Sequence, residues 1–563
     1  MLNTRSIVWL VASCCVRAVA LAVVASSPVS AQSAKEASAV ASYHLRVRAE
    51  SALNSRQYEE AEPLYDSLAI RYRKDGQFLY ERAVAKDRLG KAAEAATAYV
   101  DALRNGAWPR AEVAYRIAQL RARLGERDVA LAWVDSALVN RLKRRSRLQS
   151  DSAFISYRDD PRFRKQAGML PPGTITRDAG WRFDIALFVD EAQRLSVAPT
   201  RPAFSTSFVN AAAELSRQVP HLSDADIMLG LARLASSLGD GHSYLVRRLA
   251  TVPLQFYRFS DGLFIIKGAG AGVPLVGSRV IRIGRVTADS AMRVIASLAS
   301  QDNEMMPLWQ GVAYLASPGF LHAAGLSDDS ASIKLEIAGG TGGVRTVNIA
   351  RDTVPLFGKL AAPKPGDAAI PLWLQRAQDN HWLTKVPEMD AVYAQYNQVR
   401  NAKDQTVAQF AAKVTAALAE SRARNLIVDV RHNNGGNRIF NTPLLLAMAA
   451  FKQESPDHRV FIATGRGTFS AAQVFISQAE WMVDPIYIGE PSSSRPNFVG
   501  EESEVFLPYS KAVGSVSNQY HQGTTFQDER PFIAPQILVD LSSADYFGNR
   551  DPVMETLKML LRK

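Results

Sequence analysis

The residue of this chain best placed for nucleophilic chemistry is Ser470. It follows an apolar strand-like run and a glycine-containing turn at residues 465–470, and it precedes an apolar helical pattern that ends near Met482. At such a junction the serine hydroxyl and the next N–H, that of Ala471, lie at the positive end of the helix dipole. The hydroxyl can attack a carbonyl while the N–H binds the developing oxyanion. A serine here can also simply cap the helix, so other residues must decide between the two roles.

A second turn, with the paired glycines Gly435 and Gly436, supplies what an oxyanion hole needs. It follows an apolar strand predicted at residues 425–430. Glycine lets the backbone approach a bound group closely, so an N–H of Gly435 or Gly436 is expected to join that of Ala471 as the second oxyanion donor. A phosphate-binding or purely structural turn is the alternative. A nucleotide loop is disfavoured because no Gly-Lys-Ser or Gly-Lys-Thr follows.

Alternating strands and helices position these two turns. Strands are predicted at residues 425–430, 459–463 and 485–488, and helices begin near Phe440 and at Ser470. Strand-helix alternation with short turns indicates a parallel sheet with right-handed crossovers. Sites in such sheets lie at the carboxyl ends of the strands, where both turns fall.

The two turns, in this order and on this pattern, resemble the tail-specific, or C-terminal-processing, serine peptidases. In the better-known bacterial members the base is a lysine beyond the helix of the nucleophile, and the corresponding position here is Arg495, 25 residues after Ser470. Arginine does not lose its proton at physiological pH, so it cannot act as a general base. The sequence therefore argues against a Ser/Lys dyad.

The stretch at residues 238–244 resembles the histidine motif of the tricorn-core-like branch of this family. The resemblance implies that His242 is the general base and that Glu529, near the C-terminus, orients it. Taken alone, His242 would be interpreted as a structural or surface histidine and Glu529 as a loop carboxylate. Where that branch has a serine before the histidine, this chain has Gly241. The link between Glu529 and His242 is then absent, made by water, or made by Ser243.

Residues 42–150 have a helical pattern that repeats. Ala61, Ala95 and Ala130 recur at spacings of 34 and 35 residues in similar contexts, and the pattern resembles tetratricopeptide repeats. Small alanines let paired helices approach closely, and stacked pairs present a surface suited to a partner protein. A helical spacer that only packs on the rest of the molecule is the alternative.

The fold class predicted is multidomain. The helical repeat is followed by a helical segment at 180–250 that carries the histidine motif, a β-rich domain at 251–350, and an α/β peptidase core at 380–563 with a ClpP- or crotonase-like parallel sheet. Strand-like runs at 263–266 and 279–283 precede a helix from Ala288, and runs at 333–337 and 345–349 form a predicted hairpin. The β-rich domain resembles PDZ modules, which capture peptide ends by strand addition.

Residues 1–31 have the pattern of a secretory signal, with cleavage predicted after Ala31. The predicted location is periplasmic or secreted, with membrane association only if Cys14 is lipidated. Both cysteines, Cys14 and Cys15, lie in this segment, so the mature chain has no cysteine for a disulfide or a thiolate site. No later apolar run is long enough to span a membrane.

Removing Arg5 and Arg17 with this segment lowers the formal charge from +11 to +9. No nucleic-acid motif accompanies that charge. The densest basic run, residues 141–147, suits a solvated helix end better than a binding site. No cofactor or metal is expected.

The sequence thus predicts an exported serine endopeptidase that acts on polypeptides, with a possible protein partner on the helical repeats. Two other functions stay open. One is an inactive protein that uses the same fold to hold polypeptides, and the other is hydrolysis of a non-peptide acyl group, because crotonase-like enzymes share the oxyanion arrangement.

Overall fold

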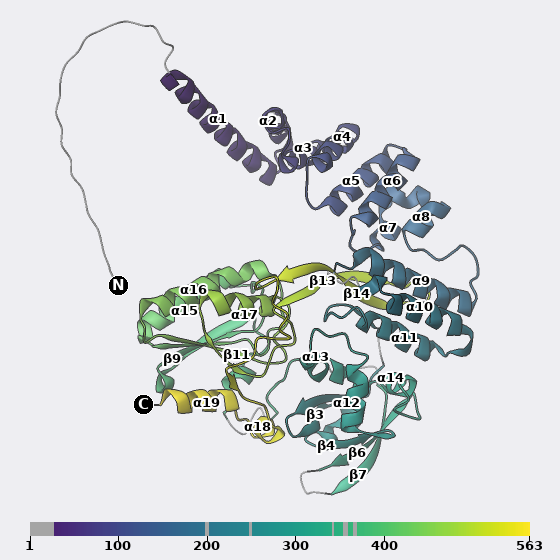
Figure 1. The fold of residues 1–563 in the computed structure, drawn as a ribbon, viewed down its shortest axis with the longest axis vertical. Helices are drawn as coiled ribbons and strands as arrows, with labels where there is room; N and C mark the ends of the chain where they lie inside the picture. Colours follow the sequence, from purple (N-terminus) through teal and green to yellow (C-terminus); the bar gives the residue numbers. More distant parts are fainter. Residues whose placement is uncertain are drawn as a thin grey trace, which may run out of the picture. The chain divides into compact units, whose positions relative to one another are not determined.

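The computed structural model describes residues 28–197, 202–246, 250–339, 343–352, 358–363 and 369–562 (Figure 1). Residues 1–27, most of the predicted export signal, lie outside this range. The chain divides into two compact units, residues 1–133 and 134–563. Among the described residues, no helix has both the length and the apolar character needed to cross a membrane.

The first unit is built from helix pairs, which confirms the predicted helical repeat. Its helices are α1 (Pro28–Asn54), α2 (Tyr58–Arg71), α3 (Gly76–Arg88), α4 (Ala92–Arg104), α5 (Arg110–Arg123) and the first part of α6 (Arg127–Val139). The predicted cleavage site after Ala31 lies within α1. The repeating alanines Ala61, Ala95 and Ala130 are fully buried, because only a small side chain lets the backbones of neighbouring helices come this close.

The turns of this unit repeat as well. Arg56, Gly90 and Gly125 precede α2, α4 and α6, and all three have positive φ angles of 61°, 76° and 76°. A positive φ closes a helix C-terminus and redirects the chain. The repeat therefore extends from the buried alanines to the backbone conformation of the turns.

In the second unit, two short helices precede three longer ones. The short helices are α7 (Arg147–Ser150) and α8 (Pro161–Gln166), and the longer ones are α9 (Arg177–Leu195), α10 (Thr206–Gln218) and α11 (Asp224–Ser236). The last three share a core with a three-stranded antiparallel sheet of order β1-β14-β13, made of β1 (Tyr244–Val246), β14 (Val513–Gln522) and β13 (Asn497–Phe506). This sheet links the histidine motif to a hairpin more than 250 residues later in the chain.

The β-rich domain is an antiparallel sheet of order β2-β3-β4-β6-β7, with β5 on β4. Its strands are β2 (Leu254–Phe259), β3 (Gly262–Gly268), β4 (Arg279–Ile283), β5 (Val286–Thr287), β6 (Ser332–Ala338) and β7 (Val344–Ala350), and its helices are α12 (Ala288–Ala296), α13 (Met305–Trp309) and α14 (Pro318–Ala323). The predicted hairpin is β6–β7. The prediction of a β-rich domain is confirmed.

The last sheet carries the predicted turns. Its order is β15-β12-β11-β10-β9-β8, and all neighbours are parallel except β8 and β9. The strands are β8 (His381–Val386), β9 (Ala391–Tyr396), β10 (Asn425–Asp429), β11 (Arg459–Thr464), β12 (Ile486–Gly489) and β15 (Ile537–Leu538). The mostly parallel sheet is the one the sequence predicts.

Helices cover this sheet on both faces, as separate buried cores show. They are α15 (Val407–Ser421), α16 (Thr442–Glu454), α17 (Ala471–Met482) and α19 (Pro552–Leu561), with the short α18 (Ser543–Phe547) before the last. Figure 1 shows α15, α16 and α17 on one side of the sheet and α19 on the other. Burial on both faces explains why the strands are continuous apolar runs.

Candidate active site

Ser470 lies on a sharp turn between β11 and α17. Its backbone angles, φ 58° and ψ −120°, are strained for a residue with a side chain. Its side chain makes no capping hydrogen bond to the helix. The helix-cap role is therefore not the one that this serine performs. A strained strand-to-helix turn is instead the device that exposes a nucleophilic serine in α/β hydrolases.

The hydroxyl of Ser470 is hydrogen-bonded to a histidine from the other end of the unit. The distance between Ser470 Oγ and His242 Nε2 is 3.0 Å, within the range at which a base can take the serine proton. The structure thus brings together the predicted nucleophile and the predicted base, which lie 228 residues apart.

Two aromatic rings hold the imidazole of His242. The Phe469 ring stacks on one side, with ring centroids 4.3 Å apart, and Phe498 of β13 stacks at 5.5 Å with a 7° angle between the ring planes. His242 is only 5% exposed. The sequence analysis did not identify either phenylalanine, although the position of Phe469 beside Ser470 could have suggested it.

The loop that carries His242 is anchored by Asp240. The buried Asp240 carboxylate accepts hydrogen bonds from the N–H groups of His242 and Ser243 and from the hydroxyls of Ser243 and Ser517. The Ser243 hydroxyl also accepts from the Ser517 N–H at 3.0 Å. Ser243 therefore holds the loop on β14, and its hydroxyl makes no link between His242 and a glutamate.

His242 is a neutral base at ordinary pH. Its pKa is lowered to about 4, mainly by burial and to a smaller extent by the nearby His521, while Glu501 and the Val499 carbonyl act in the opposite direction. A buried imidazole resists protonation because the charged form loses its hydration. The uncharged Nε2 is the form able to accept the Ser470 proton.

The predicted role of Glu529 stays a prediction, and no direct bond to His242 supports it among the described residues. His242 Nδ1 is buried and has no hydrogen-bond partner among the described residues, and Glu529 is exposed. The residues on either side of Glu529 explain its position. Asp528 pairs with Arg530, which also pairs with Glu480 of α17 at 2.8 Å. These pairs hold the loop against α17, and no bond in the described part of the chain ties Glu529 to His242.

The glycine turn lies directly beside the nucleophile. A Cβ atom on Gly435 would be 2.8 Å from Ser470 Cβ and 3.1 Å from the Ala471 nitrogen, and a Cβ on Gly436 would be 2.2 Å from the Val399 carbonyl oxygen. Both glycines also have positive φ angles, 110° and 140°. Only glycine fits at either position.

The backbone N–H groups beside Ser470 differ in whether they already have a hydrogen-bond acceptor. The Gly435 N–H donates to Asn433 Oδ1 at 3.1 Å, so of the two predicted alternatives the Gly436 N–H is the one favoured. No hydrogen bond is found for the N–H of Gly436 or of Ala471 within the described residues. These two N–H groups are the remaining predicted donors.

A serine at Gly241, as in the branch that the sequence resembles, would press on two neighbouring side chains. A Cβ atom there would be 2.6 Å from Met306 Cε and 3.0 Å from Phe469 Cε2. The Gly241 N–H donates to Asp302 Oδ1 at 2.8 Å. Burial, together with the neighbouring Asp240, raises the pKa of Asp302 to about 7. Asp302 is a second anchor of the histidine loop, and no sequence pattern pointed to it.

Arg495 serves a structural purpose. Its Nε donates to the Asp302 carbonyl oxygen at 2.7 Å. Its neighbour Ser494 is fully buried and accepts a hydrogen bond from the Ser470 N–H at 3.3 Å. The segment in which the sequence resemblance would place a lysine thus supports the nucleophile turn and the Asp302 loop.

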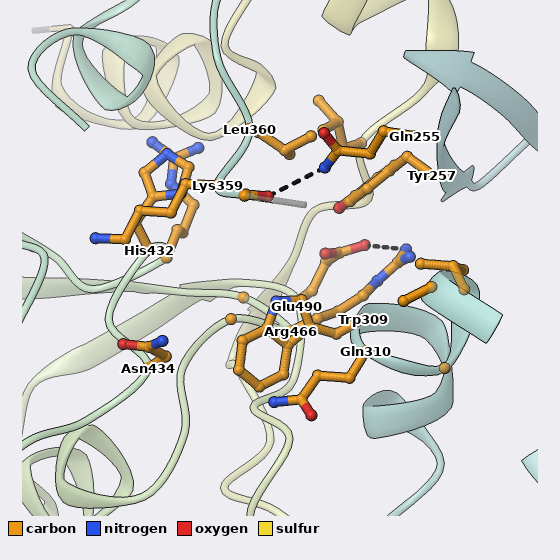
Figure 2. Close-up of a pocket in the computed structure, with 18 of the residues that line it drawn as sticks. Gln255, Tyr257, Trp309, Gln310, Lys359, Leu360, His432, Asn434, Arg466 and Glu490 are labelled. Carbon is orange, nitrogen blue, oxygen red and sulfur yellow. Dashed lines mark hydrogen bonds and ion pairs between the residues drawn. The ribbon is translucent and has the colours of Figure 1, made fainter. Parts of the chain in front are cut away.

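A cavity of about 1110 Å³ adjoins the site (Figure 2). Its lining includes Gly241 of the histidine loop, Asn434 of the glycine turn and Gly467 of the nucleophile turn. The far walls come from the β-rich domain and carry large apolar rings such as Phe256 and Trp309. A cavity of this size suits a large organic ligand or a peptide side chain.

The polar groups of the cavity are mostly paired. Arg466 and Glu490 form a buried ion pair at 2.5 Å, drawn in Figure 2. Lys359 Nζ donates to two backbone carbonyls, and burial lowers its pKa to about 8. His432 Nε2 is buried and finds no hydrogen-bond partner in the described ranges, and burial lowers the His432 pKa to about 4. No group of three or more metal-binding side chains is found in the described part of the chain.

No protein-family model matches the sequence, and no curated protein does. Among solved structures the chain is similar to mature CPAF complexed with lactacystin, with 12% identity, 68% of this chain and 98% of that chain covered, and a TM-score of 0.47. The photosystem II D1 C-terminal processing protease is 11% identical, with 69% of this chain and 98% of that chain covered and a TM-score of 0.33. The tricorn protease is 12% identical, with 68% of this chain and 37% of that chain covered and a TM-score of 0.27.

Proposed function

We propose that this protein is a serine endopeptidase of the tail-specific family, of the tricorn-core-like branch, with Ser470 as nucleophile and His242 as general base. The observation that carries the proposal is the 3.0 Å hydrogen bond between Ser470 Oγ and His242 Nε2. The strained turn at Ser470 and the free N–H groups beside it support the same role.

The reaction follows from this arrangement. Ser470 Oγ attacks the carbonyl carbon of a peptide bond while its proton passes to His242 Nε2. The N–H groups of Ala471 and Gly436 receive the oxyanion. His242 returns the proton to the departing amine as the C–N bond breaks, which leaves an acyl ester on Ser470. A water molecule, deprotonated by His242, then attacks the ester and releases the carboxylic acid.

Polypeptides are the proposed substrates, and the periplasm or the exterior of the cell is the proposed location. The cavity, which is lined by residues next to the nucleophile and the histidine but by neither Ser470 nor His242, has space and apolar surface for peptide side chains. The export signal predicted at residues 1–31 supports the location, and the helical repeat is proposed to bind a protein partner.

Casein hydrolysis tests this function. The mature protein should degrade casein, Ser470→Ala should reduce the rate to background, and Ser67→Ala should leave it unchanged. Ser67 is a matched serine on the surface of α2, where its hydroxyl bonds only the Pro63 carbonyl. Hydrolysis of small thioesters without casein cleavage would favour the acyl-hydrolase alternative, and absence of both activities would favour the inactive binding protein.

A further inference from the structure

The basic run at residues 141–147 meets the strand that packs on the catalytic histidine. Lys143 Nζ lies 2.7 Å from Glu501 Oε1, and the Ser146 hydroxyl donates to Glu504 Oε1 at 3.3 Å. Both glutamates belong to β13. The run therefore has a specific acidic partner and is more than a solvated helix end.

Strand β13 contacts His242 directly. Phe498 stacks on the imidazole, and a Cβ atom on Gly500 would lie 3.3 Å from both His242 Cε1 and His521 Cδ2. Glu501 is the next residue. Its backbone therefore follows directly on the position at which β13 meets the two histidines.

The backbone at Glu501 is unusual. Its φ angle is 61°, although it lies between residues in regular antiparallel pairing, Gly500 with Gln519 and Glu502 with Ser517. A left-handed conformation is unfavourable for a glutamate in a strand, and such strain persists at functional sites because the surrounding structure maintains it. In a regular strand the Glu501 side chain would point to the face opposite Phe498 and Gly500, away from His242. The left-handed conformation of Glu501 interrupts this alternation.

We propose that Glu501 is the positioning residue that stabilises protonated His242 during acylation, and that Lys143 restrains this effect by holding the Glu501 carboxylate. The proposal rests on the function proposed above. It assigns to Glu501 the electrostatic part of the role that the family resemblance implies for Glu529.

The chemistry requires such a residue. When His242 takes the Ser470 proton, a positive charge forms in a buried site between two phenylalanine rings. The Val499 carbonyl favours that charge but is itself neutral, and no charged group bonds Nδ1 among the described residues. Asp240 is close in sequence, but its carboxylate is already bonded by the groups of its own loop and by Ser517. Glu501 is half exposed, and within the described part of the chain its carboxylate bonds only Lys143, so its charge can respond to His242.

The electrostatic directions agree with this geometry. Glu501 raises the pKa of His242 and also that of His521, whereas Lys143 lowers the pKa of His521. The Lys143 ammonium, followed by the two histidines, lowers the pKa of Glu501. The titratable or charged groups on the elements around His242 are Asp240, Asp302, Glu501, Glu502, His521, Lys143 and Arg438.

The test compares Glu501→Gln with Lys143→Met by the pH dependence of fluorophosphonate labelling, which reports acylation alone. Labelling of the wild type should fall as His242 becomes protonated, with a midpoint near the His242 pKa of about 4. Glu501→Gln should move this midpoint down by about half a pH unit and slow labelling about threefold at neutral pH, because the imidazolium loses a screened charge partner. Lys143→Met should move the midpoint up.

Opposite shifts separate this role from a structural one. Each variant removes the same ion pair, so a purely structural pair would give shifts of the same sign or none, and either result would overturn the proposal. Glu504→Gln is the matched control on the same strand and should behave as wild type. High salt should shrink the Glu501→Gln effect, because the residue is half exposed. A wild type that does not label at all would instead contradict the proposed function.

Discussion

The two halves of the candidate site are held in different ways. The nucleophile half consists of backbone: the end of β11, a strained turn at Ser470, the glycine turn after β10 and the start of α17. The histidine half is held by side chains, with two phenylalanine rings on His242 and the carboxylates of Asp240 and Asp302 on its loop. The position of the serine is thus set by local chain geometry, and that of the base by long-range packing.

Gly435→Ala should have the largest effect, because it breaks the backbone half. The new Cβ would lie 2.8 Å from Ser470 Cβ in a backbone conformation that disfavours alanine. The turn that carries the Gly436 N–H would then move, and the loss of one oxyanion donor lowers acylation about 100-fold. Single-turnover labelling measures this rate.

Gly319→Ala is the control for that variant, since nothing lies within 4 Å of the added Cβ. It should label at the wild-type rate. Normal labelling of Gly435→Ala, with an unchanged unfolding temperature, would show that the glycine turn takes no part in the site.

Gly241→Ser should have an intermediate effect on the side-chain half. The variant introduces the serine that the tricorn-core-like branch has at this position. Its Cβ would displace Met306 and press on Phe469, and Phe469 stacks on His242. We expect acylation about three- to tenfold slower, in line with overpacking that costs about 1 kcal/mol.

The double variant Gly241→Ser with Met306→Ala checks the cause of that loss. It should recover part of the rate, since the closest contact, with Met306 Cε, is removed. Faster acylation in Gly241→Ser alone would mean that the hydroxyl is useful and that the packing around Gly241 is not limiting.

Glu529→Gln should have the smallest effect. The residue is exposed, and no bond among the described residues connects it to His242. Acylation should stay within about twofold of wild type, as for most surface substitutions. An acylation rate lowered tenfold or more, at unchanged stability, would show that Glu529 takes part in catalysis and would weaken the role proposed for Glu501.

The same contrast explains what the sequence predicts. The strands at 425–430, 459–463 and 485–488 and the helix after Ser470 were found nearly residue for residue, because apolar runs and glycine turns are local signals. The nucleophile followed from them. His242 could be identified only through a family resemblance, since its role depends on a contact across 228 residues.

The residues that contact His242 could not be predicted from the sequence, for a physical reason. Phe498 and Glu501 lie on the β13–β14 hairpin, whose docking on the histidine loop depends on tertiary packing. Glu529 matched a family position, but its loop is fixed by the ion pairs of Arg530. Sequence patterns identify elements and turns, whereas the partner of a buried imidazole depends on how distant elements meet.

The most direct test of Ser470 as nucleophile and His242 as base is to map the fluorophosphonate adduct by mass spectrometry on the wild type and on His242→Ala. We expect one adduct, on the peptide that contains Ser470. For His242→Ala we expect a loss of about 1000-fold or more in labelling rate, with the unfolding temperature preserved. An adduct on another residue, no adduct under conditions that label a control serine peptidase, or an undiminished rate in His242→Ala would contradict it.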